Sequence, residues 1–127
     1  MRYIALLPFL SLWGCSANQK SALKKAIVCP EPYVKIHESI LQERKPDPVL
    51  QNQLAEIIGS LNVKEESAVM SACGRMMVDD KRTWDFLFGE EGAAKLQEFS
   101  LMTDAQREEF GNNVFAPLYE RKAKAFL

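Results

Sequence analysis

The chain has few of the residues and motifs on which enzymes commonly build their chemistry. Its 127 residues include one histidine and three cysteines, and no Cys-x-x-Cys pair, Gly-x-Ser-x-Gly elbow or glycine-rich phosphate loop occurs. These absences leave no motif for thiol redox chemistry, serine hydrolysis or nucleotide binding. Lysine and arginine (16) nearly balance aspartate and glutamate (17). The chain therefore lacks the basic excess that wrapping a polyanion requires, and we expect no nucleic-acid partner.

The remaining titratable groups are a poor basis for catalysis. A histidine-based site would have to be built around His37, which falls on the apolar side of a predicted helix, where packing is the commoner role. The acidic pairs Asp79-Asp80, Glu90-Glu91 and Glu108-Glu109 are sequence neighbours. Neighbours on a helix point about 100° apart, so these pairs do not converge on one substrate. We expect no catalytic residue.

The N-terminal segment has the pattern of an export signal. Arg2 precedes an uncharged stretch from Tyr3 to Gly14, which is too short to cross a membrane, since a spanning helix needs about 20 residues. A basic residue followed by a short apolar run is typical of a secretory signal peptide. Its end, Leu12-Trp13-Gly14-Cys15, resembles the lipobox of bacterial lipoproteins, with a bulkier residue at Trp13 than is usual there. An ordinary signal peptide, or an unprocessed N-terminus with a chance cysteine, is the alternative.

The resemblance implies that the chain is a lipoprotein. In that family the leader, here residues 1–14, is removed, and the cysteine, here Cys15, carries the lipid. Several acyl chains would make the anchoring effectively permanent. Residues 15–28 would then be the lipidated N-terminus and a tether. The residue after the cysteine, Ser16, favours the periplasmic face of the outer membrane, with the inner membrane or the cell surface as alternatives.

Two cysteines, Cys29 and Cys73, are left if Cys15 carries lipid. An exported protein with two remaining cysteines most simply joins them in one disulfide. Metal binding is the weaker alternative, because two cysteines and one histidine supply too few ligands at usable spacing. We therefore expect a Cys29–Cys73 disulfide, no metal and no cofactor.

The rest of the chain, residues 29–127, is expected to fold as a single helical domain. Its length suffices for one domain and not for two. No segment alternates with period two, whereas apolar residues recur at helical spacing. The sequence predicts a compact all-α bundle of four to five helices, clamped by the disulfide. The expected helices cover residues 32–44, 48–60, 63–81, 90–101 and 104–125.

Capping signals mark where three of these helices begin. Asp47, directly before Pro48, predicts an N-cap followed by proline in the first turn. Asn62 with Glu65 predicts a capping box, and so does the stretch from Thr103 to Gln106. We expect these side chains to accept hydrogen bonds from the first free N–H groups of their helices.

Other residues predict helix ends and inward faces. Gly59 is expected to end the second helix in a left-handed conformation, and Pro117 should kink the last helix or mark a break near Asn113. The faces expected inside are Tyr33, Ile36, His37, Ile40 and Leu41; Leu50, Leu54, Ile57, Ile58 and Leu61; Val69, Ala72, Cys73, Met76 and Met77; Ala93, Leu96 and Phe99 or Leu101; and Phe110, Val114, Pro117 and Leu118.

Aromatic residues gather after the third predicted helix, in the stretch from Trp84 to Phe88. The safer interpretation is a hydrophobic lid at one end of the bundle. The alternative is that some of these rings are exposed and anchor a protein partner. The nearby methionines are predicted either to fill the core or to line an adaptable groove for a helical segment. The predicted partner-binding residues are Trp84, Phe86, Phe88, Met76 and Met77.

A membrane-anchored helical domain without a catalytic motif is most economically a binding protein. In architecture it resembles the pilotins, small outer-membrane lipoproteins that carry secretin subunits of secretion systems, with only the lipobox shared as a motif. The resemblance implies a non-enzymatic accessory or assembly factor of an envelope complex, with a helical client segment as partner. An exclusion or inhibitory lipoprotein of a plasmid or phage is the second hypothesis. An envelope enzyme acting on peptidoglycan or lipid is the third.

Overall fold

The computed structural model describes residues 28–127, most of which are helical. The predicted leader, the lipobox with Cys15 and the tether up to residue 27 lie outside the described residues. From residue 28 to residue 127 no strand occurs, and no helix is long and apolar enough to cross a membrane. The all-α prediction is confirmed, and the structure contains the expected Cys29–Cys73 disulfide.

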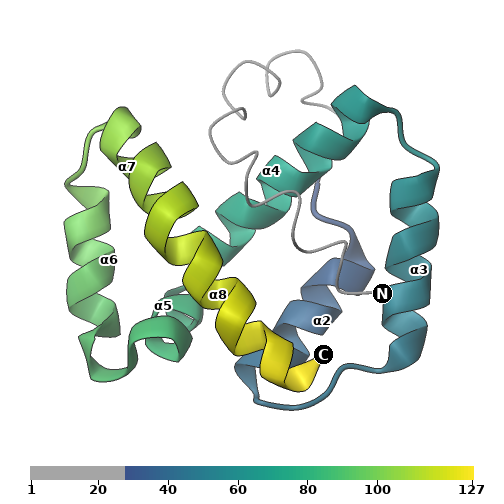
Figure 1. Ribbon diagram of the computed structural model, residues 1–127, viewed down its shortest axis with the longest axis horizontal. Coiled ribbons are helices and arrows are strands. Elements are labelled where there is room, and N and C mark those ends of the chain that lie inside the picture. Colours follow the sequence, from purple (N-terminus) through teal and green to yellow (C-terminus); the bar gives the residue numbers. More distant parts are fainter. Residues whose placement is uncertain (1–27) are drawn as a thin grey trace.

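Seven α-helices and three shorter helical turns follow one another along the described chain. The α-helices are α2 (Glu31–Leu41), α3 (Pro48–Gly59), α4 (Val63–Asp79), α5 (Lys81–Phe88), α6 (Gly92–Ser100), α7 (Asp104–Phe110) and α8 (Ala116–Ala123). The turns are the 3-10 helices η3 (Gly89–Glu91) and η5 (Lys124–Phe126) and the π-helical turn η4 (Gly111–Phe115). Figure 1 shows α3 and α6 at opposite ends of the molecule, with α4 and α8 crossing between them. α2 packs mainly against α3, and α5 packs against α6.

Local capping chemistry sets the starts of three helices as predicted. The Asp47 side chain accepts a hydrogen bond from the backbone N–H two residues further on, at the start of α3. Asn62 and Glu65 form the capping box of α4, and Thr103 and Gln106 form that of α7. Each cap satisfies N–H groups that have no partner within their own helix.

The ends of α2 and α3 differ from the prediction. α2 ends at Leu41 rather than at residue 44, because Glu43 adopts a left-handed conformation with φ 57°. Gly59 is not a left-handed cap: it is the last residue of α3, and Ser60 follows with φ −91°. The Ser60 hydroxyl and N–H both donate to the Ile57 carbonyl. The end of α3 is therefore satisfied without a left-handed residue.

The aromatic stretch after α4 forms a helix of its own, α5, which the prediction had not included. α4 ends at Asp79 because Asp80 is extended (φ −99°, ψ 111°), and the Asp80 side chain caps α5. Gly89, with φ 61°, then turns the chain into α6. A Cβ on Gly92 would lie only 2.9 Å from the Asp85 Cα. A glycine at this position therefore lets α6 approach α5 closely.

The inward face of α6 begins at that glycine. Gly92 and Phe99 are buried and Leu96 is half-buried, and these residues follow the i, i+4, i+7 spacing of one helix face. Ala93 and Leu101, which were expected inside, are exposed. Ala93 lies one residue, and hence about 100°, away from the packed face, and Leu101 follows the end of the helix.

One wide turn interrupts the last predicted helix. α7 ends at Phe110, η4 forms a π-helical turn, and α8 begins at Ala116. The predicted break near Asn113 is therefore confirmed, and Asn113 lies within η4. Pro117 falls in the first turn of α8, where a missing N–H costs little. The break thus takes the form of an extra residue in the turn before the proline.

That extra residue changes which side chains of this segment face the core. Val114 and Pro117, which were expected inside, are exposed. Phe115 and Tyr119 are buried in their place. Phe110 and Phe115 are five residues apart, which is the spacing of a π turn, and both rings pack on the same tryptophan.

The core lies where α2, α4, α5 and α8 meet. Periodicity predicted the central inward residues of α2 and α4, and those at the margins, Leu41, Ala72 and Met76, are half-buried. In α3 only Leu54 is fully buried. The buried residues of α2 and α4 that the pattern predicted are Tyr33, Ile36, His37, Ile40, Val69, Cys73 and Met77.

Candidate functional site

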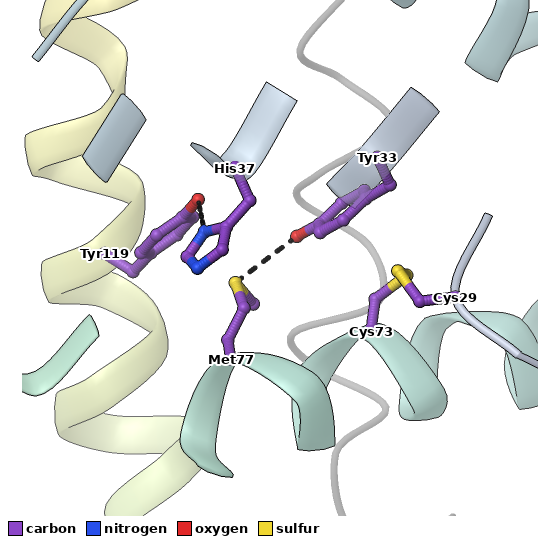
Figure 2. The surroundings of a disulfide bond; sticks show 6 residues. All are labelled: Cys29, Tyr33, His37, Cys73, Met77 and Tyr119. Atoms are coloured by element: carbon purple, nitrogen blue, oxygen red, sulfur yellow. Dashed lines mark hydrogen bonds between the residues drawn. A yellow bond between two sulfur atoms is a disulfide. The ribbon is translucent and has the colours of Figure 1, made fainter. Parts of the chain in front are cut away.

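The one histidine of the chain lies at the junction of three helices. His37 on α2 has 2% of its surface exposed. Its Nδ1 lies 2.9 Å from the Tyr119 Oη on α8 (Figure 2), and its Nε2 lies 3.2 Å from the Thr83 Oγ1 on α5. Burial lowers the pKa of His37 to about 4, so the ring is neutral at pH 7.

A neutral imidazole suits this environment. It has one donor and one acceptor nitrogen, so one of the two hydroxyls donates to the ring and the other accepts. Both nitrogens are thereby satisfied within the core, and a substrate would reach His37 only if the helices moved apart. Packing of the histidine matches the predicted role, whereas its partners Tyr119 and Thr83, 82 and 46 residues away in sequence, were not predicted.

The disulfide joins the start of the domain to the middle of α4. Cys29, directly before α2, is bonded to Cys73 (Figure 2). One turn into α2, the Tyr33 hydroxyl donates a hydrogen bond to the Met77 Sδ of α4 at 3.6 Å. Burial raises the pKa of Tyr33, so the phenol keeps its proton and remains a donor. α2 and α4 are thus joined by a covalent bond and by a buried hydrogen bond.

An apolar cleft lies between α3 and α4 beside this disulfide. Its lining residues are Pro30, Tyr33, Leu54, Ile58, Val69, Met70 and Cys73. Among the side chains of these residues, Tyr33 has the one hydroxyl group, and this hydroxyl points to Met77 (Figure 2). The cleft has a volume of about 10 Å³, which is close to one water-sized sphere. It therefore fits the tip of one apolar side chain rather than a whole helix.

Trp84 is the centre of an aromatic cluster that joins α5 to α6, α7 and η4. Its side chain has no exposed surface, and its indole N–H donates to the Val78 carbonyl at 2.8 Å. The rings around it, with centroids 5.2–6.0 Å away, belong to Phe88, Phe99, Phe110 and Phe115. This cluster holds the C-terminal half of the domain on the end of α4.

Two of the five predicted partner-binding residues are inaccessible. Trp84 and Met77 have no exposed surface, so a partner could contact them only if the helices around them moved apart. The other three, Phe86, Phe88 and Met76, are half-buried and pack against the core. For these three residues partner binding stays a prediction.

A surface ion-pair network lies beside the buried histidine. Arg82 on α5 pairs with Glu38 of α2 and with Asp80, and its Nη2 lies 2.6 Å from a carboxylate oxygen of each. The hydrogen bonds from Arg82 lower the pKa of both carboxyl groups. Exposed pairs of this kind add little stability, and the geometry instead orients α2 against α5. Nothing in the sequence indicates that Glu38 and Arg82 form an ion pair, because they are 44 residues apart.

Comparison of the chain with protein-family models, with curated proteins and with solved structures finds no match. Within residues 28–127, no group of three or more histidine, cysteine, aspartate or glutamate side chains could hold a metal ion. The geometry of the described residues is therefore the basis on which a function can be proposed.

Proposed function

We propose that this protein is a lipid-anchored protein on the periplasmic face of the bacterial outer membrane, which binds a partner protein and performs no catalysis. It would serve as an accessory or assembly factor of an envelope or secretion complex, as pilotins do. The observation that carries the proposal is the apolar cleft beside the Cys29–Cys73 disulfide. Such a cleft receives an apolar side chain. The phenol of Tyr33 in its lining keeps its proton and donates a hydrogen bond to Met77.

The construction of the cleft supports this role. Pro30 restricts the backbone at one wall, and the disulfide holds that wall to α4. A site formed before binding loses less conformational entropy when a partner arrives. Val28, next to Cys29, is where the proposed tether joins the domain. A partner that places one apolar side chain in the cleft would therefore be held close to the proposed point of membrane attachment.

The anchor is tested by replacing Cys15 with serine. We expect wild-type protein in the membrane fraction and the Cys15→Ser variant in the soluble fraction, because each buried methylene of the lipid contributes about 0.8 kcal/mol to membrane binding. Fractionation and the intact mass of the extracted protein are the measurements. As a control, a Cys29→Ala/Cys73→Ala variant should stay with the membrane. A wild-type mass without lipid would contradict the anchor and leave the cleft as a site for a diffusible protein.

Substitutions on α3 test whether the cleft binds a partner. We expect Ile58→Glu to reduce recovery of a partner in affinity purification from envelopes at least about tenfold, because an unpaired carboxylate is costly in an apolar contact. Val49→Glu is the matched control, since Val49 lies on the same helix with 54% of its surface exposed, and it should change recovery less than about twofold. A photo-reactive residue at position 58 should crosslink the same partner, and one at position 49 should not.

The identity of the captured protein then separates the remaining hypotheses. A secretin or another assembly subunit would support the pilotin-like role, whereas an envelope receptor or transfer channel would support an exclusion lipoprotein. Equal recovery with Ile58→Glu, Val49→Glu and wild type would contradict the cleft as the contact surface.

A further inference from the structure

Tyr119 gives α8 a buried polar contact with α2, beside the apolar packing of Ala116 and Ala123. The Tyr119 ring lies between His37 of α2 and Phe86 of α5, with centroid distances of 5.6 and 6.4 Å. Its hydroxyl is hydrogen-bonded to the His37 Nδ1. Directly before α8, the π-helical turn η4 departs from regular α-helical geometry. α8 thus makes a buried hydrogen bond through Tyr119, and an irregular turn precedes its N-terminus.

We propose that His37, Thr83 and Tyr119 form an acid-sensitive latch, which holds α8 against α2 and α5 while the imidazole is neutral and releases α8 when the imidazole takes up a proton. In the neutral state, one hydroxyl donates to the ring and the other accepts. A protonated ring has two donors, so both hydroxyls must accept. The hydroxyl hydrogen that pointed at the ring then loses its acceptor inside the core, where an unpaired polar group is costly.

The charged groups around the ring come from the helices packed on it. Glu38 on α2 and Asp80 at the start of α5 favour protonation of His37, and Arg82 on α5 opposes it. Glu38 and Asp80 each form an ion pair with Arg82 at the surface. On α8, burial raises the pKa of Tyr119, so its hydroxyl remains neutral. Burial of the imidazole outweighs the attraction of the two carboxylates, and the pKa of His37 is lowered to about 4.

The pH window of the latch follows from these environments. When α8 is released, His37 is solvated and titrates near its ordinary pKa of 6.5, whereas in the closed state it stays neutral down to about pH 4. The closed state therefore loses stability relative to the open state as the pH falls from about 6.5 to about 4, and no further below that. Over this range the equilibrium shifts about a hundredfold toward release of α8. The three residues of the latch do not line the proposed partner cleft, which is formed by Pro30 and by residues of α2, α3 and α4.

Hydrogen–deuterium exchange of the mature protein tests the latch. With intrinsic exchange rates corrected for pH, we expect the protection of amides 118–123 in α8 to fall about a hundredfold between pH 6.5 and pH 4. The protection of amides 49–59 in α3 should fall less than about threefold, because no contact of the latch involves α3. In His37→Gln, which retains all carboxylates but cannot take up a proton, the protection of α8 should stay constant over the same range.

Three results would overturn the latch: constant α8 protection in the wild type, the same acid-induced fall in His37→Gln, or simultaneous loss of protection in α3 and α8. Should His37→Gln fail to fold, Tyr119→Phe keeps the ring and removes only the hydroxyl. We then expect α8 to lose about tenfold protection at pH 7 with α3 unchanged. Unchanged α8 protection in Tyr119→Phe would contradict the proposal.

Discussion

Replacing Trp84 by alanine should remove a large part of the stability of this domain. Truncating a fully buried aromatic side chain to alanine costs about 3–5 kcal/mol, and Trp84 has no exposed surface and contacts four phenylalanine rings. The Val78 carbonyl would also lose the indole donor, which adds about 1 kcal/mol. Small domains have only about 5–15 kcal/mol in total. Urea unfolding followed by far-UV circular dichroism measures the loss.

Two further variants make the Trp84 result interpretable. Trp84→Phe keeps an aromatic ring and should cost less than half as much as Trp84→Ala. Leu101→Ala removes a side chain that is 79% exposed and should change the free energy of unfolding by less than about 0.5 kcal/mol. If Trp84→Ala unfolds at the same urea concentration as the wild type, then Trp84 is not the centre of the packing between α5, α6, α7 and η4.

The starts of α3, α4 and α7 could be predicted because a helix N-terminus depends on residues close together in sequence. Asp47, Asn62 and Thr103 accept hydrogen bonds from N–H groups two or three residues further along, and no other part of the chain is needed. The inward faces of α2 and α4 could be predicted for a similar reason. Within one regular helix, side chains three and four residues apart necessarily share a face.

Two features escaped prediction, and the second of them depends on distant parts of the chain. α5 is short and rich in aromatic residues, which are only moderate helix formers, and its cap Asp80 had been included in the preceding helix. The π turn η4 adds one residue, and this moves Phe115 rather than Val114 into the core. What favours this arrangement is the packing of Phe115 on Trp84, a contact that spacing within the last helix does not indicate.

In the candidate sites, too, the disulfide could be predicted from the sequence, whereas contacts between distant residues could not. The Cys29–Cys73 pair could be predicted from the number of cysteines, because only two are left if Cys15 carries lipid, as we propose. The partners of His37 could not, since hydroxyl-bearing residues are numerous and nothing in the spacing selects Thr83 and Tyr119. The cleft was likewise hidden, because its walls come from the segment before α2, from α2 itself and from both α3 and α4.

Removing the disulfide should cost the domain about 4 kcal/mol. Cys29 and Cys73 are 44 residues apart, and a cross-link over a loop of this length lowers the entropy of the unfolded chain by about that amount. We expect the urea midpoint of Cys29→Ala/Cys73→Ala to fall strongly below that of the oxidised wild type. Reduced wild-type protein should show nearly the same midpoint as the variant, because both lack the cross-link.

The location of the bond predicts a local effect as well. Without the disulfide, Pro30 and Tyr33 lose their covalent link to α4, and packing and the Tyr33–Met77 hydrogen bond remain. Hydrogen exchange in the first turn of α2 should therefore rise more than exchange in α7, which lies far from the bond in sequence and is held by the Trp84 cluster. If α2 and α7 lose protection equally, the bond acts through the unfolded chain alone. The cleft would then keep its shape in the reduced protein, and partner recovery would not depend on the disulfide.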